Sequence, residues 1–192
     1  SAPANTMSIE YTGGDDLIVE NNTIVDNYHG ILIASQGNAT IRDNVISGNG
    51  YQGIKVAGGQ AKDNNIVIES NTISNNGQNG TLIQDTGNSS FTGEITQNNI
   101  VDNSDFGVAN QHPDVVIDAT SNWWGATNGP GGDLNGNGSA VTGPVSVDPA
   151  TISLDDGSVS LTQDFLGVVE DSQNVTLNGT SDATFSFDSE SV

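Results

Sequence analysis

A nine-residue pattern occurs four times in the first half of the chain, and it constrains the fold more than any other feature. Each copy reads as an aliphatic residue, two spacers, Asn, one spacer, Ile, two spacers and Asn. A Gly and a short aliphatic segment follow each copy. Such repetition predicts copies of one supersecondary unit stacked on each other. The copies are residues 19–27, 41–49, 68–76 and 95–103, and the Gly residues are Gly30, Gly53, Gly80 and Gly107.

Aligning the first Asn of each repeat places the aliphatic residues in columns. Asn22, Asn44, Asn71 and Asn98 are 22, 27 and 27 residues apart, and Asn122 follows after 24. Apolar and polar residues alternate over short stretches without a helical period, which predicts short strands around a shared aliphatic core. Two positions, Thr81 and Asn110, hold polar residues where Ile or Val is expected and predict weaker packing. The columns are Val19, Ile41, Ile68, Ile95; Ile24, Ile46, Ile73, Ile100; and Ile31, Ile54, Thr81, Val108.

The Asn and Gly columns have a structural interpretation. Asn tolerates the left-handed backbone that a sharp turn requires, and Gly does the same work at the next corner. Asn residues stacked on successive coils can also hydrogen-bond in a ladder. We therefore interpret this column as structural: Asn22, Asn44, Asn71, Asn98 and Asn122.

The pattern resembles the parallel β-helix repeat family, whose right-handed solenoids are common in secreted polysaccharide-active enzymes, surface proteins and phage tailspikes. The segment 121–125, which contains Trp123 and Trp124, is followed by Gly129-Pro130 and resembles the closing coil of β-helix domains in archaeal and bacterial surface proteins. The resemblance covers about residues 15–132 and implies an all-β, right-handed parallel β-helix of about five to six coils. It leaves the activity open, because one fold hosts many functions.

The two tryptophans and the C-terminal third suggest how the solenoid closes. Consecutive strand residues point to opposite sides, so one ring of Trp123 and Trp124 should enter the last coil and the other should face the appendage or solvent. We expect a β-helix over residues 1–132 and a Gly/Asn/Pro-rich loop or cap over 133–150, with a strand near Val145 to Val147. Residues 151–192 alternate again and predict a strand-rich cap or the start of a further β domain.

Composition limits the classes of partner and the environment. The chain has 24 acidic and 3 basic residues, a formal net charge of −21, which excludes nucleic-acid binding as a leading function. This balance suits high salt or divalent cations and is typical of a halophile. There is no Cys, and no apolar run is long enough for a membrane span. The start at Ser1-Ala2-Pro3 suggests a mature product or an excised segment. N-glycosylation sequons begin at Asn21, Asn38, Asn79, Asn88, Asn137, Asn174 and Asn178.

The residues before the column of Gly residues form the best candidate glycan-binding patch. Tyr28 and Tyr51 should be neighbours on successive coils, with His29, Gln52 and Lys55 close by. Aromatic rings beside amides and a cation provide the stacking and hydrogen bonds that a sugar-binding surface needs. The alternative is that the stacked rings only stabilise a turn.

A second outward column places Arg42 between Glu20 and Glu69 on adjacent coils, about 4.8 Å apart. This column predicts a surface ion-pair ladder. A polysaccharide lyase would need a base near a neutralised uronate, for which His29 or Lys55 could serve with Arg42 assisting. No acidic pair falls in register on adjacent coils for a glycosidase.

A loop after the repeats matches the first half of an EF-hand calcium loop: Asp133, Asn135 and Asn137 follow D-x-N-x-N-G. Pro144 stands at position twelve, where an EF-hand requires a bidentate Glu, so a Ca²⁺ ion here would need further ligands from elsewhere. The alternative is an ordinary Gly-Asn turn.

Together these features predict a secreted or cell-surface solenoid of a salt-loving organism. It would act as a structural, adhesive or glycan-contacting module, with polysaccharide, a surface glycan or neighbouring copies of itself as partner. One alternative is a lyase or glycosidase acting on acidic polysaccharide. Another is a filament subunit, in which solenoid ends or the tail after residue 150 pair with the next copy by strand addition.

Overall fold

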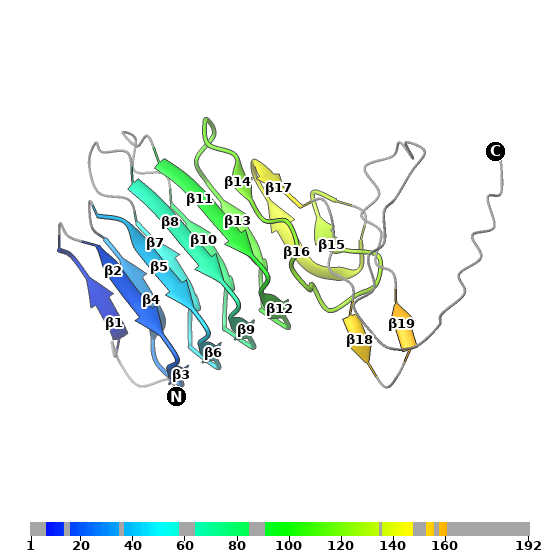
Figure 1. The fold of residues 1–192 in the computed structure, drawn as a ribbon, viewed down its shortest axis with the longest axis horizontal. Coiled ribbons are helices and arrows are strands. Elements are labelled where there is room, and N and C mark those ends of the chain that lie inside the picture. Colours follow the sequence, from blue (N-terminus) through cyan, green and yellow to red (C-terminus); the bar gives the residue numbers. More distant parts are fainter. Residues whose placement is uncertain are drawn as a thin grey trace, which may run out of the picture.

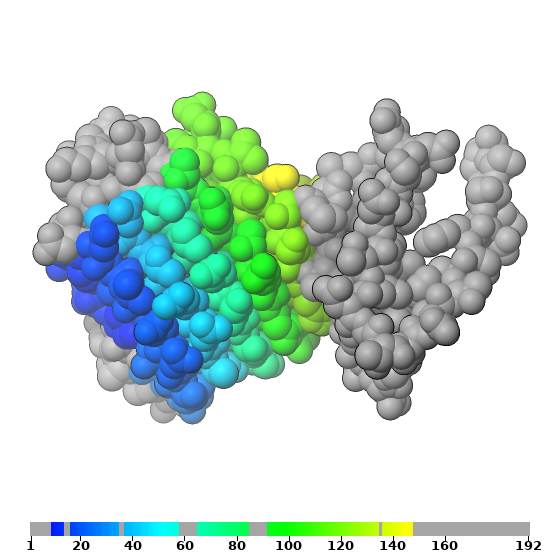
Figure 2. All heavy atoms as spheres, in the orientation of Figure 1, coloured from blue at the N-terminus to red at the C-terminus, as the bar shows by residue number. Residues whose placement is uncertain are grey.

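The computed structural model describes residues 7–13, 16–34, 37–57, 64–84, 91–134, 136–147, 153–155 and 158–160. In these residues every regular element is a β-strand, and the strands wind into a parallel solenoid whose coils stack side by side (Figure 1). The coils also form successive bands across the molecular surface (Figure 2). None of the described segments is a helix that could cross a membrane.

Three parallel sheets run along the solenoid, and successive coils add strands to each of them. Sheet A contains β1 (Met7–Tyr11), β4 (His29–Ile33), β7 (Ile54–Val56), β10 (Thr81–Ile83), β13 (Val108–Asn110), β16 (Gly138–Thr142) and β15 (Pro130–Gly132). Sheet B contains β2 (Leu17–Glu20), β5 (Ala39–Arg42), β8 (Asn64–Glu69), β11 (Phe91–Thr96), β14 (Ile117–Asp118) and β17 (Val145–Ser146). Sheet C contains β3 (Thr23–Val25), β6 (Val45–Ser47), β9 (Thr72–Ser74) and β12 (Asn99–Val101).

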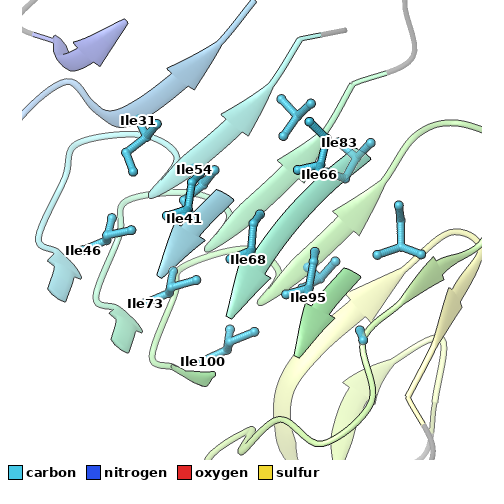
Figure 3. Close-up of a cluster of buried hydrophobic side chains, with 14 of the residues drawn as sticks. Ile31, Ile41, Ile46, Ile54, Ile66, Ile68, Ile73, Ile83, Ile95 and Ile100 are labelled. Carbon is cyan, nitrogen blue, oxygen red and sulfur yellow. The ribbon is translucent and has the colours of Figure 1, made fainter. Parts of the chain in front are cut away.

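The core is the aliphatic columns predicted from the repeats. Pairing between β2, β5, β8 and β11 aligns the column from Val19 to Ile95, and pairing between β3, β6, β9 and β12 aligns the column from Ile24 to Ile100. These side chains are at most 4% exposed and point into the tube (Figure 3). Strands this short cannot bury a face alone, so the stacking of coils creates the core.

Asn residues form ladders at both corners that flank sheet C. At the first corner, the backbone N–H and Nδ2 of each Asn donate to Oδ1 of the Asn on the next coil, from Asn22 to Asn122. A second ladder runs through Asn27, Asn49, Asn76 and Asn103. The ladder prediction is confirmed, and the second ladder adds to it.

The expected backbone role of the ladder Asn residues was wrong. The left-handed conformation belongs to the residue immediately before each of them, as at Asp43 with φ 55° and Ser70 with φ 56°. That residue turns the chain outward, and the next Asn points back into the stack. At Gly30, Gly53, Gly80 and Gly107 the reason for Gly also differs, because none has a positive φ. A Cβ at Gly53 would lie 2.7 Å from the carbonyl oxygen of Gly80, so close approach of adjacent coils requires Gly there.

The two polar residues in the aliphatic columns behave differently from each other. Thr81 is fully buried, and its Oγ1 has no hydrogen-bond partner among the described residues. The amide of Asn110, by contrast, is hydrogen-bonded. Its Nδ2 donates to the carbonyl oxygens of Val115 and Pro144 at 2.7 and 2.8 Å, and its Oδ1 accepts from the backbone N–H of His112. Asn110 therefore ties the last loop to the closing turn.

The solenoid continues beyond residue 132, where we expected it to end. Strand β16 pairs with β13 and β17 pairs with β14, so the last coil extends to Ser146 and includes the strand expected near Val145. Trp124 is 1% exposed in the core, and Trp123 is partly exposed beside Asn99. Strands β18 (Ser153–Asp155) and β19 (Ser158–Ser160) form an antiparallel hairpin. The remainder of the strand-rich segment predicted over residues 151–192 lies outside the described residues.

Candidate functional site

The candidate site is a group of residues at and beside the corner between sheets C and A, which we call the aromatic edge: Tyr28, His29, Tyr51, Gln52 and Lys55. Tyr28 and Tyr51 occupy equivalent positions on successive coils, where the Tyr51 backbone N–H donates to the Tyr28 carbonyl at 2.8 Å. Lys55 lies on β7, paired with Leu32 of β4. The structure thus brings Tyr28, Tyr51 and their neighbours together as the sequence predicted.

The two tyrosine rings form a stack that solvent reaches. Their centroids are 4.2 Å apart with an interplanar angle of 37°, and Tyr51 is 36% exposed. His29 packs edge-on against Tyr28 at 4.8 Å and lies 5.7 Å from Tyr51. A hydrogen bond with the Tyr51 side chain is the main cause that raises the pKa of Tyr28, so the Tyr28 phenol is neutral at physiological pH. The two tyrosines therefore offer aromatic ring surface and two hydroxyl groups at this corner.

His29 is part of the support beneath this stack. It is only 8% exposed, and its Nδ1 has no hydrogen-bond partner within the described part of the chain. Burial lowers the pKa of His29, and the positive charge of Lys55 lowers it further. His29 is therefore neutral at neutral pH, and its burial limits its use as a base toward a large polymer.

Gln52 is also buried, at 6% exposed. Its Nε2 donates to Oε1 of Gln78 on the next coil at 2.5 Å. Gln52 thus positions the corner, and the exposed part of the aromatic edge consists of Tyr51, with Tyr28 and Lys55 partly exposed.

Arg42 does not join this group. It lies at the end of β5 in sheet B, whereas His29 and Lys55 belong to sheet A. Among the described residues Arg42 has no ion pair with Glu69, so only the Glu20 half of the predicted ladder is confirmed. Its Nη2 and Nε donate to Oε2 of Glu20 at 2.6 and 2.9 Å. This hydrogen bond is the main cause that raises the pKa of Arg42. The combination of His29, Lys55 and Arg42 that a lyase would need is therefore not assembled.

The predicted calcium residues are only partly described. Asp133 is exposed, and its Oδ2 accepts from the backbone N–H of Gly143 at 2.9 Å. Asn137 is exposed, and its backbone N–H donates to Oδ1 of Asn128. Asn135 lies outside the described residues. Within the described ranges, no three His, Cys, Asp or Glu side chains are grouped as metal ligands.

Comparison with known families agrees with this architecture. The family described as right handed beta helix region matches residues 4–106, more than half of the chain. The chain belongs to the right-handed β-helix family. The matched region of this β-helix includes the four repeats and the aromatic edge and ends before Trp123 and Trp124, so it does not cover the closing segment. No similar curated protein and no similar solved structure was found.

Three features of this β-helix were missed in the sequence. The second Asn ladder had a signal, because each repeat ends in Asn at the same distance from the Ile. The contact of Gln52 with Gln78 had no signal in the register, since Gln52 stands one residue before Gly53 and Gln78 stands two residues before Gly80. The hydrogen bonds of Asn110 had no signal in the sequence, because its partners Pro144 and Val115 lie outside the repeat pattern.

Proposed function

We propose that this β-helix is an extracellular, cell-surface module that forms a rigid support and contacts a glycan through the aromatic edge. The Tyr28–Tyr51 stack is the observation that carries the proposal. It places two rings from successive coils side by side with Tyr51 exposed, and Lys55 lies close enough to His29, which packs on these rings, to lower its pKa. Stacking on a sugar ring uses the apolar face of the aromatic ring, and the hydroxyls and ammonium supply directional contacts.

Rigidity supports the same proposal. The aliphatic columns and the two Asn ladders join neighbouring coils through buried contacts, as in the bonds of Asn44 to Asn71 and of Asn49 to Asn76. A stack of this kind loses little conformational entropy when it binds, because its side chains are already ordered.

Binding can be tested by affinity electrophoresis in gels that contain neutral or acidic polysaccharides. We expect retardation by at least one of these polymers and loss of that retardation in Tyr51→Ala. Ile18→Ala is the matched control, because Ile18 is 63% exposed on sheet B, away from the aromatic edge. Urea unfolding of both variants separates binding from stability. Retardation by no polymer in the panel, or equal retardation of Tyr51→Ala and the wild type, would contradict the proposal.

We also propose that the chain works in high salt, because self-repulsion at a net charge of −21 is screened there. Thermal unfolding across a NaCl titration should show a rising midpoint. Ca²⁺ added at constant ionic strength, with EDTA as its control, should raise the midpoint further if Asp133 contributes to a calcium site. A midpoint that is independent of NaCl would refute the halophilic assignment.

A further inference from the structure

The structure sorts the N-glycosylation sequons by whether their Asn could carry a glycan. Seven Asn-X-Ser/Thr motifs occur in the sequence, and four of their Asn residues are described: Asn21, Asn38, Asn79 and Asn137. The motif marks a candidate acceptor, but a folded glycoprotein must also have room for the sugar beside the amide. Burial and hydrogen bonding therefore separate the four.

Two of the four amides are unsuited. Asn79 is only 9% exposed, and its Oδ1 is buried without a partner among the described residues, so a glycan on its Nδ2 would disrupt the packed corner. Asn38 is exposed, but both atoms of its amide are engaged. Its Nδ2 donates to Oδ1 of Asp16 at 3.0 Å, and its Oδ1 accepts from the backbone N–H of Asn65 at 2.9 Å.

The other two amides are open. Asn21 is exposed in the left-handed conformation, with φ 57°, and only its backbone N–H is used, toward the carbonyl oxygen of Arg42. Asn137 is exposed, and only its backbone N–H is used, toward Asn128. Neither side chain has a hydrogen bond within the described residues. Both sit in turns, where a branched sugar can extend into solvent.

We propose that Asn21 and Asn137 are N-linked glycan acceptors and that Asn38 and Asn79 are not. The inference rests on the extracellular placement in the proposed function. The donor class is an oligosaccharide linked to a lipid diphosphate. The Asn Nδ2 forms a bond to the anomeric carbon of the sugar, the bond from that carbon to the phosphate oxygen breaks, the lipid diphosphate leaves and Nδ2 loses one proton.

The position of Asn21 gives its glycan a further role. It stands between β2 and β3, which are the edge strands of sheets B and C at the N-terminal end of the described solenoid. Edge strands offer unpaired backbone groups to other chains, and natural proteins shield them. A glycan on Asn21 covers this edge with a hydrated, bulky group that hinders strand addition.

Glycopeptide mapping of the full chain, purified from the surface fraction of its native host, tests the assignment. We expect sugar on Asn21 and Asn137 and unmodified Asn38 and Asn79. Unmodified Asn21 and Asn137, or a glycan on Asn79, would overturn it. Because the sample comes from the surface fraction, such a result would leave the proposed glycan contact intact. Conversely, failure of polysaccharide binding by a correctly glycosylated protein would refute only the proposed contact.

Two sequon variants test the role at the edge without replacing the acceptors. Thr23→Val removes the hydroxyl of the Asn21 sequon and keeps a β-branched side chain on β3. Ser139→Ala likewise removes the hydroxyl of the Asn137 sequon. Both variants are produced in the native host and compared by sedimentation velocity at high salt. We expect the Thr23→Val protein to self-associate and the Ser139→Ala protein to remain monomeric. Equal behaviour of the two variants would overturn the shielding role.

Discussion

Replacing Asn71 by Ala tests the ladder at its centre. The Asn71 amide nitrogen lies within 3.0 Å of oxygens on Ile41, Glu69 and Asn98, and its Oδ1 accepts from the backbone N–H and Nδ2 of Asn44 at 3.0 Å. The side chain is 2% exposed. Its removal therefore leaves polar groups of two neighbouring coils without their partners, in a place that water does not reach.

The expected loss of stability follows from the polar groups that Asn71→Ala leaves without a hydrogen-bond partner. The buried Asn44 N–H loses the only acceptor that the structure gives it, which costs about 1–3 kcal/mol. The other lost bonds have partial substitutes, since Asn44 Nδ2 keeps the carbonyl oxygens of Val19 and Arg42, and together they add about 1–2 kcal/mol. We expect a loss of about 2–5 kcal/mol in the free energy of unfolding, and a loss near the middle of this range lowers the thermal midpoint by about 7–14 °C.

Asn22→Ala is the matched control, because it removes the same side chain from the same ladder at the exposed end. The Asn22 amide donates to the carbonyl of Glu20 and to Asn44 Oδ1, but its own oxygen accepts from no described residue. Asn44 Oδ1 keeps the Asn22 backbone N–H at 2.9 Å, so we expect a loss below about 1 kcal/mol. Urea unfolding followed by circular dichroism at fixed NaCl measures both. Equal losses in the two variants would refute the reasoning.

Three further variants test the core, the coil spacing and the aromatic edge. Thr81→Val removes a buried hydroxyl that has no partner in the described structure, so the urea midpoint should rise by the equivalent of about 1 kcal/mol; a lower midpoint would show that the hydroxyl is satisfied. Gly53→Ala places a methyl group 2.7 Å from the Gly80 carbonyl oxygen and should cost about 1–3 kcal/mol in the same assay, whereas an unchanged midpoint would mean that the coils can separate. His29→Gln should flatten the pH dependence of stability. Burial and Lys55 lower the pKa of His29, so the unfolded state binds more protons as pH falls below 6.5 and the wild type loses stability there. Parallel urea midpoints of the variant and the wild type above and below pH 6.5 would argue against this linkage.

Much of the candidate site was predictable because the repeat carries its own register. Residues at equal distances from the repeated Asn or the repeated Gly must stack. Tyr28 and Tyr51 each stand two residues before the Gly, and Glu20 and Arg42 each stand two residues before the Asn, so both pairs of neighbours follow from counting. Counting residues along the sequence could not show which of these neighbours remain exposed to solvent. Gln52, which we expected in the glycan-binding patch, is buried and hydrogen-bonded to Gln78 on the next coil.

The sequence alone determined the coil length, the aliphatic columns and the Asn ladders, because each depends on a pattern that recurs within one turn of the chain. Only the tertiary structure decided that the residue before each ladder Asn turns left-handed and that Gly53 is required by the approach of Gly80. It also decided that Asn21 is open while Asn79 is enclosed. These properties depend on atoms from coils about one repeat away along the chain, and burial and close contact exist only once those coils are stacked.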